Sequence, residues 1–206
     1  MKTFLTELTG TLILTLATLA HESSTKSLAI AFVLFLFITF NENATNHYNP
    51  AVSLMQSFLT DVPKYKILQA VTAQYIGASL AGAVTALLQM NSWEYSKSHE
   101  PIGITISEFV GTLILLCAII ISSTTTNSLA SIVIGGSLFL SINCMKDYGE
   151  TSFNPARSFG DLILSLVTDK YVDVVEKLLS QFIPYLAALV CVTMVLLLRR
   201  NENTNL

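Results

Sequence analysis

The tripeptide Asn-Pro-Ala occurs twice in this 206-residue chain, at Asn49-Pro50-Ala51 and at Asn154-Pro155-Ala156, once in each half of a strongly apolar sequence. Each copy predicts a helix start, because Asn is a preferred N-cap and proline suits the first helical position, where its missing N–H costs nothing. A single copy is weak evidence, since short motifs arise by chance. Two copies in corresponding places make coincidence improbable, and inside a membrane two such starts predict a pore between them.

The composition predicts that most of the chain lies in lipid. Hydrophobic residues make up 52% of the sequence, charged residues 12%, and the mean hydropathy is +0.60, which is too apolar for an ordinary soluble domain. The net charge is -3 and Lys and Arg form no basic stripe, so nucleic acid is excluded as a partner. The cysteines are too widely spaced for a disulfide framework or a metal site, so we predict no metal; we expect no cofactor either. They are Cys117, Cys144 and Cys191.

Six apolar stretches approach the 17 to 25 residues, roughly, that a membrane-spanning helix needs. They cover residues 4–20, 28–40, 67–89, 102–122, 129–144 and 178–198. Two further segments, 49–59 and 154–167, begin at the Asn-Pro-Ala copies. At about 1.5 Å per residue each reaches roughly half of the hydrocarbon core. These two are therefore predicted to be half-helices that enter the membrane without crossing it.

The two halves of the sequence repeat each other. The segment ELTGTLIL beginning at Glu7 matches EFVGTLIL beginning at Glu108, and each is followed by an Asn-Pro-Ala copy at a similar offset. Three spans per half is an odd number, so the second half enters the membrane upside down. The predicted fold is a single all-α membrane domain over residues 1–206, with six transmembrane helices, two re-entrant half-helices and inverted repeats at about 1–90 and 101–200. Such repeats place a site at the midplane, where the repeats meet.

The polar residues of the half-helices indicate what this site does. Capping leaves the side-chain amides of Asn49 and Asn154 free to donate toward a permeant oxygen. Each half-helix N-terminus carries about half a positive charge, which opposes cations but not water. Arg157, one turn beyond Asn154, adds donors and a fixed charge. The alternatives are ordinary caps in loops and, for Arg157, an interfacial side chain that reaches the headgroups.

Glu7 and Glu108 are carboxylates within apolar spans, at matching places in the repeat. Ionisable residues in a membrane usually face the bundle interior with a partner, and here the expected partners are backbone N–H groups of the re-entrant loops. The alternative is a proton relay, although no chain of titratable groups joins the two. His47 is a further candidate, as a metal ligand or a pH gate, but a lone His beside a half-helix is more often structural.

The motifs resemble those of the aquaporin family over almost the whole chain. HYNPAVS from His47 and NPARSFG from Asn154 are similar to the family's two signatures, while AQYIG from Ala73 and Pro184 are similar to its third-helix and sixth-helix patterns. The resemblance implies one pore per subunit, a homotetramer, cytoplasmic termini and no cofactor. It also implies that Glu7 and Glu108 are scaffolds that hold loop carbonyls toward the pore.

The outer filter departs from that of a strict water channel. By the resemblance, its four positions fall on Ile142, on Ala29 (or Ile30 if the preceding loop hides a deletion), on the Thr151 carbonyl and on Arg157. Two of these replace a His and an aromatic residue that water-selective members usually carry. The predicted filter is therefore wider and more apolar. Ser158 points the other way, because it stands where glycerol-conducting members carry Asp.

The function that we expect is a passive channel for water, with glycerol, urea or other small neutral solutes as further candidates and with protons and ions excluded. The alternative is a structural or adhesive membrane protein with a closed pore. An enzyme is disfavoured, because no nucleophile, base and orienting group can be assembled from the motifs. We expect a multi-pass protein of the cell membrane with both termini cytoplasmic, although the distribution of Lys and Arg does not decide its orientation.

Overall fold

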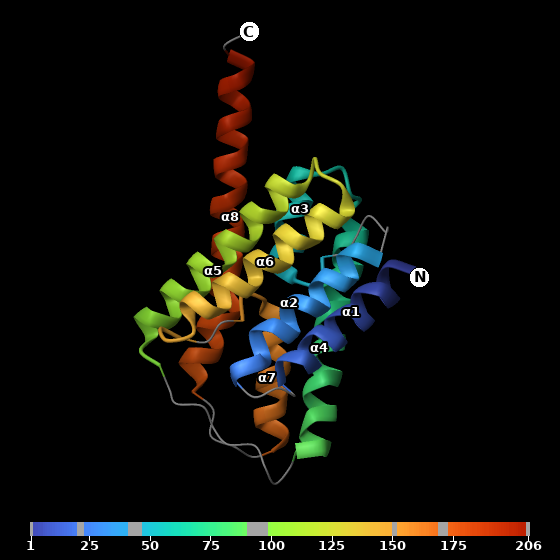
Figure 1. Cartoon of the computed structure of the whole chain (residues 1–206), viewed down its shortest axis with the longest axis vertical. Helices are drawn as coiled ribbons and strands as arrows, with labels where there is room; N and C mark the ends of the chain where they lie inside the picture. Colours follow the sequence, from blue (N-terminus) through green and yellow to red (C-terminus); the bar gives the residue numbers. More distant parts are fainter. Residues whose placement is uncertain are drawn as a thin grey trace.

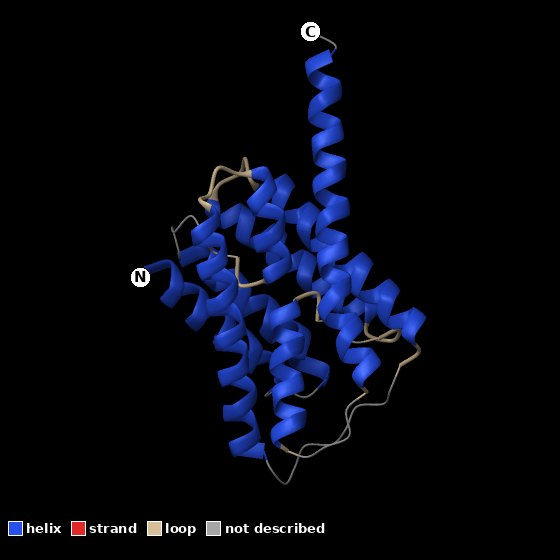
Figure 2. Ribbon diagram, turned by 180° about the vertical axis from the view of Figure 1, so that it is seen from behind, coloured by secondary structure: helices blue, strands red, loops and turns tan. Residues whose placement is uncertain are grey.

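The computed structural model describes residues 2–19, 23–40, 47–89, 99–149, 152–168 and 173–204, and all regular structure in these residues is helical (Figure 2). Six long helices and two short ones are present, as the sequence predicts. They are α1 (Lys2–Leu19), α2 (Ser23–Phe40), α3 (Pro50–Leu59), α4 (Lys64–Gln89), α5 (Pro101–Ser122), α6 (Asn127–Met145), α7 (Pro155–Val167) and α8 (Val174–Thr204).

Most long helices run past the apolar stretches that predict them. α4 begins at Lys64 instead of residue 67, and α8 extends from Val174 to Thr204 instead of from 178 to 198. Hydropathy marks only the part of a helix that lies in lipid, whereas the backbone ladder continues into polar residues at the interface. Among the described helices three are, by length and composition, long and apolar enough to cross a membrane, namely Lys64–Leu88, Pro101–Ser122 and Val174–Asn201, while Thr25–Phe40 and Leu129–Met145 are apolar but shorter.

The packing of the helices follows the predicted repeat. α1 packs on α4 as α5 packs on α8, and α4 packs on α7 as α8 packs on α3. α2 packs on its own counterpart α6, and the half-helices α3 and α7 contact each other. In Figure 1 the two halves interlock, while the last turns of α8 extend beyond the other helices to the C-terminus. The half-helices thus lie inside a frame of long helices contributed by both repeats.

Two tyrosines mark the pseudo-two-fold relation between the repeats. The segment QYIGA from Gln74 corresponds to PYLAA from Pro184, so Tyr75 on α4 and Tyr185 on α8 are equivalent residues. Their hydroxyl oxygens lie 3.0 Å apart in a hydrogen bond. A residue meets its own counterpart only near a two-fold axis. The axis that relates the halves therefore passes close to this bond.

Candidate pore between the two half-helices

A cavity of about 120 Å³ lies where the two half-helices meet. Its polar lining consists of His47, Asn49, Gln56, Ser152, Asn154 and Arg157. The apolar lining comes largely from the long helices, including Leu34 and Ile38 on α2 and Ile134 and Leu138 on α6. The cavity thus has one polar side, built from the loops and half-helices, and one apolar side, built from long helices of both repeats.

Both Asn-Pro-Ala copies form the predicted helix starts. The side-chain Oδ1 of Asn49 accepts a hydrogen bond from the Ala51 N–H at 2.9 Å, and that of Asn154 accepts one from the Ala156 N–H at 3.1 Å. Proline occupies the first turn in each case. The caps are therefore local structures that the tripeptide itself specifies.

The two asparagines also bond across the cavity, each to the other half. The amide nitrogen of Asn49 donates to the Phe153 carbonyl at 2.7 Å, and that of Asn154 donates to the Tyr48 carbonyl at 2.8 Å. The sequence-based expectation that these amides are free is therefore wrong in part, because the opposite loop uses one N–H of each. An amide group carries two N–H donors, so one donor per asparagine remains for a permeant molecule.

The residues before each asparagine adopt a left-handed backbone conformation. The φ angles are 49° at Tyr48 and 53° at Phe153, values that are costly for residues with a bulky side chain. The carboxylate of Glu7 accepts hydrogen bonds from the N–H groups of His47 and Tyr48 at 2.8 and 2.7 Å. These carboxylate bonds hold the first loop in its strained conformation.

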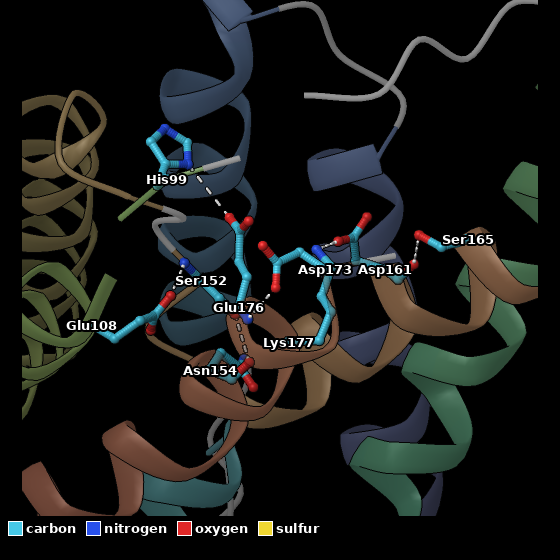
Figure 3. Close-up of polar contacts among 9 residues, drawn as sticks. All are labelled: His99, Glu108, Ser152, Asn154, Asp161, Ser165, Asp173, Glu176 and Lys177. Carbon is cyan, nitrogen blue, oxygen red and sulfur yellow. Dashed lines mark hydrogen bonds and ion pairs between the residues drawn. The ribbon is translucent and has the colours of Figure 1, made fainter. Parts of the chain in front are cut away.

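The second loop is held in the same way. The carboxylate of Glu108 accepts hydrogen bonds from the N–H groups of Ser152 and Phe153, both at 2.8 Å, and Figure 3 shows it beside Ser152. Both Glu7 and Glu108 are fully buried. The structure thus brings each of the two predicted carboxylates to the expected backbone N–H groups.

In each half, a glycine on a long helix faces the aromatic ring of the residue with the left-handed backbone conformation. A Cβ added to Gly10 on α1 would collide with the ring of Tyr48, and one added to Gly111 on α5 would collide with the ring of Phe153. Both rings are completely buried. The absence of a side chain at these glycines therefore makes room for the ring of the strained residue.

Arg157 lies inside the protein and lines the cavity. Its side chain is 3% exposed, its Nε donates to the Thr18 hydroxyl at 2.8 Å, and its Nη1 donates to the Ser152 carbonyl at 2.9 Å. An arginine that reaches the headgroups would be exposed instead. The guanidinium is thus fixed from two sides, by α1 and by the second loop, with its charge next to the cavity.

The two loops differ in the side chains that support them. In the first half, Gln74 on α4 donates to Glu7 at 2.8 Å and to the Ser53 hydroxyl at 3.0 Å, and the His47 ring contacts Ser53 at 3.0 Å. In the second half, the residue equivalent to Ser53 is Ser158, whose buried hydroxyl has no hydrogen-bond partner in the described residues. Ser53 therefore takes part in the side-chain network around the first loop, whereas its equivalent Ser158 takes part in none among the described residues.

Charged residues tie the middle of α7 to the start of α8, a feature that the sequence analysis did not predict. Lys177 on α8 forms an ion pair with Asp161 on α7, and His99 contacts Glu176 at 3.4 Å. Figure 3 shows Glu176 and Lys177 at the start of α8 with their partners His99 and Asp161. The ion pair holds the half-helix that carries Arg157 against a transmembrane helix.

The remaining predicted filter residues lie close to the cavity or outside the described chain. Ile30 and Ile142 are buried in the apolar cluster that contains the cavity residues Leu34 and Leu138, but neither borders the cavity itself. Ala29 is half-buried. Thr151 falls outside the described residues. Of the four expected filter positions, the structure thus brings Arg157 alone to the cavity among those that it describes.

Several residues that shape the site carry no assigned role in the sequence analysis. Thr18 and Ser152 hold Arg157, Gln74 supports Glu7, and Gln56 lines the cavity. One available signal is spacing, since Gln56 follows Asn49 by seven residues and thus shares its helix face. Thr18 and Gln74 give a weaker signal, as polar side chains within apolar spans.

Comparisons with known proteins agree with this geometry. Over 132 residues the chain is 32% identical to Aquaporin NIP2-1 of Arabidopsis thaliana, covering 57% of this chain and 46% of that protein. It is 27% identical to Nodulin-26 of Glycine max, covering 61% and 49%. The chain thus spans about half the length of the curated relatives that it matches.

The fold is also that of a solved structure. The X-ray structure of the aquaglyceroporin from Plasmodium falciparum superposes with a TM-score of 0.75 over 92% of this chain and 93% of that one, at 21% sequence identity. This likeness confirms the predicted fold of long helices with two half-helices. The family model "Major intrinsic protein" matches residues 1–195, and the chain therefore belongs to the major intrinsic protein family, as an integral membrane protein.

Proposed function

We propose that this chain is a passive channel for water and for small neutral solutes such as glycerol or urea, and not an enzyme. The observation that carries the proposal is the cavity between the half-helices, with Asn49, Asn154 and Arg157 on one side and apolar side chains on the other. A solute that carries both CH groups and hydroxyls can place its CH groups against the apolar side of the cavity and its hydroxyls against the polar side. The family and the aquaporin relatives support the same general activity.

Cation exclusion is part of the proposal and follows from charge. The N-termini of α3 and α7 both face the cavity, as the crossed asparagine bonds require, and each contributes about half a positive charge. Arg157 adds a full charge nearby. A cation or a proton would have to pass all three without its hydration shell. Neutral water and polyols meet no such barrier, in the manner established for aquaporin-type pores.

The test is a stopped-flow comparison of water, glycerol and urea flux in proteoliposomes made with the purified protein. We expect water permeability well above that of empty liposomes, with a low activation energy, together with glycerol or urea flux and with background proton conductance. Correctly inserted protein that passes no water would contradict the channel and favour a structural role with a closed pore. Water flux with complete exclusion of glycerol and urea would contradict only the solute range.

The apolar filter is a further part of the proposal, and Ile142→His tests it. Ile142 lies in the apolar cluster next to the cavity, so the longer polar ring of His is expected to reach further from α6 and to narrow the passage. Glycerol flux should fall more than water flux, since the larger molecule encounters the narrowing first. If the ratio of the two fluxes does not change, Ile142 does not form the filter. Ala29 and Ile30 on α2, which remain part of the proposal, are tested by the same substitution at each position.

The assembly that the family resemblance implies belongs to the same proposal. The cavity is lined by loops and helices of both halves of one chain, so each subunit of the expected homotetramer would have its own pore in the lipid bilayer. We also propose that both termini are cytoplasmic and that the protein resides in the cell membrane. Cross-linking in native membranes tests the tetramer, and protease access to a C-terminal tag in sealed vesicles tests the orientation.

A further inference from the structure

Gln56 is a cavity residue for which the features described so far provide no role. It lies on α3 and lines the cavity together with Asn49 and Val52. These three residues are spaced by three and then four positions, so they form one stripe along the half-helix. From Asn49 to Gln56 the helix rises by about 10.5 Å, at ~1.5 Å per residue. Gln56 therefore lies about two turns from the crossed asparagines along the passage.

The side-chain amide of Gln56 is available for a ligand. The Gln56 backbone carbonyl accepts hydrogen bonds from Thr60, but no group in the described part of the chain bonds to the Gln56 side chain. Another polar residue of the cavity on the same half is His47, whose ring Nδ1 contacts Ser53 and whose Nε2 has no partner among the described residues. An amide offers both a donor and an acceptor to a neutral solute.

The equivalent position in the other half shows that this arrangement is not a symmetric requirement of the fold. By the repeat, Gln56 corresponds to Asp161 on α7, which forms an ion pair with Lys177 and does not line the cavity. Val52 corresponds in turn to Arg157. Each half-helix thus presents one long polar side chain to the cavity, but at different distances from its asparagine.

We propose that Gln56 is a hydrogen-bonding station for permeating solutes that carry hydroxyl or amide groups, on the α3 side of the crossed asparagines. The inference rests on the proposed channel function and adds a specificity residue to it. A polyol or urea molecule that enters a narrow pore loses hydrogen bonds to water, and groups left unpaired raise its barrier. Gln56 replaces some of these bonds after Asn49 and Asn154 have done so. A permeating water molecule depends less on a hydrogen bond from Gln56, because the water molecules before and after it in a single-file column bond to it.

The test compares Gln56→Met with the wild-type protein in proteoliposomes, using glycerol, urea and water as probes. Met has a similar length but lacks the amide. Ser57→Ala, a change next to it in sequence and away from the cavity lining, is the matched control. We expect glycerol and urea flux to fall at least about three-fold on loss of one hydrogen bond, with water flux nearly unchanged in both variants. Gln56→Asn retains the amide on a shorter side chain and should restore part of the solute flux.

The possible outcomes separate the inference from the function on which it rests. Retained water flux in Gln56→Met shows that the variant is folded and inserted. If glycerol and urea flux are then also unchanged, or if all three fluxes fall in proportion, the inference is overturned while the channel stands. Wild-type protein that passes water but neither solute overturns the inference as well. Wild-type protein that passes nothing overturns the proposed function itself.

Discussion

The surroundings of Asn49 and of Asn154 are alike in their backbone and different in their side-chain support. In both halves a buried glutamate holds two loop N–H groups, a strained aromatic residue precedes the asparagine, and the amide bonds to the opposite loop. Around the first loop, Gln74 and Ser53 extend this support. Beside the second, Arg157 donates to the Thr18 hydroxyl and to the Ser152 carbonyl instead.

This difference separates what builds the pore from what makes it selective. The shared features fix the two helix starts, which either half needs in order to enter the membrane with satisfied backbone groups. The features that differ between the two halves set the charge and polarity along the passage. The positions that mirror Arg157 and Thr18 are Val52 in the first half and Ile119 in the second, and both pack within an apolar cluster. The fixed charge therefore lies on one side of the midplane only.

The largest effect is expected from the glutamates, and it tests whether the two backbones are equally dependent on them. Glu108→Ala leaves two buried N–H groups without partners, at about 1–3 kcal/mol each. Glu7→Ala does the same and also removes an acceptor from Gln74. Both variants should lose most of their folded yield. Thermal unfolding in detergent measures this, and a near-wild-type midpoint in either variant would show that its loop does not depend on the carboxylate.

Arg157 and Val52 form the second comparison. Arg157→Val should raise cation or proton leak by about ten-fold or more, because each ~1.4 kcal/mol taken from a barrier is a factor of ten in rate. Val52→Arg puts a charge where Ile119 cannot bond to it, so this variant should block water flux or fail to fold. A fluorescent pH assay in liposomes measures the leak. An unaltered leak in Arg157→Val would show that the half-helix dipoles suffice.

A smaller difference is expected between the side chains that support the two loops. Gln74→Leu leaves Ser53 and Glu7 without their bonds to the amide and should lower stability by about 1–3 kcal/mol. Ser158→Ala removes a buried hydroxyl that bonds to nothing in the described residues and should change stability by less than about 0.5 kcal/mol. A large loss on Ser158→Ala would instead reveal a partner for this hydroxyl, such as a buried water molecule.

The smallest effect concerns the symmetric pair. Tyr75→Phe and Tyr185→Phe each remove the same hydrogen bond and should cost similar amounts, about 0.5–1.5 kcal/mol. Because both variants break one shared bond, the double variant should cost little more than either alone. Unfolding midpoints measured in parallel test this. Costs that add fully would show that the two hydroxyls are bonded elsewhere.

The helix starts and the repeat could be predicted because they depend on local sequence. Asn followed by Pro specifies a cap and a first turn by itself, and the glutamates recur with the same neighbours in both halves. The crossed bonds of Asn49 and Asn154 could not be predicted, because they depend on how closely two segments approach that are 104 to 106 residues apart in sequence. The motif determines each helix start but not the distance between the two starts.

The residues that face the cavity were harder to predict because the spans are apolar on all sides. On α2, Ile30 and Leu34 are buried while Leu28 and Phe32 are exposed, although all four are apolar. Lipid and protein core favour the same side chains, so hydropathy does not fix the rotation of a helix about its axis. Ile30 and Ile142, the filter positions assigned by counting along the sequence, therefore lie near the cavity but are not among the residues that line the cavity.

The crossed asparagine bonds also have a consequence for the synthesis and membrane insertion of the protein. The first half is synthesised well before Phe153 exists, so at that stage Asn49 has no carbonyl to bond and Tyr48 has no amide to accept from. Until α7 is synthesised and inserted, α3 therefore lacks the crossed hydrogen bonds, and we expect it to be poorly anchored in the bilayer or to lie outside it. Neither half can complete a site alone, but two copies of an ancestral half inserted in opposite directions could complete each other. Separately expressed halves of this chain are therefore expected to regain a pore only when both are inserted together, with opposite topologies.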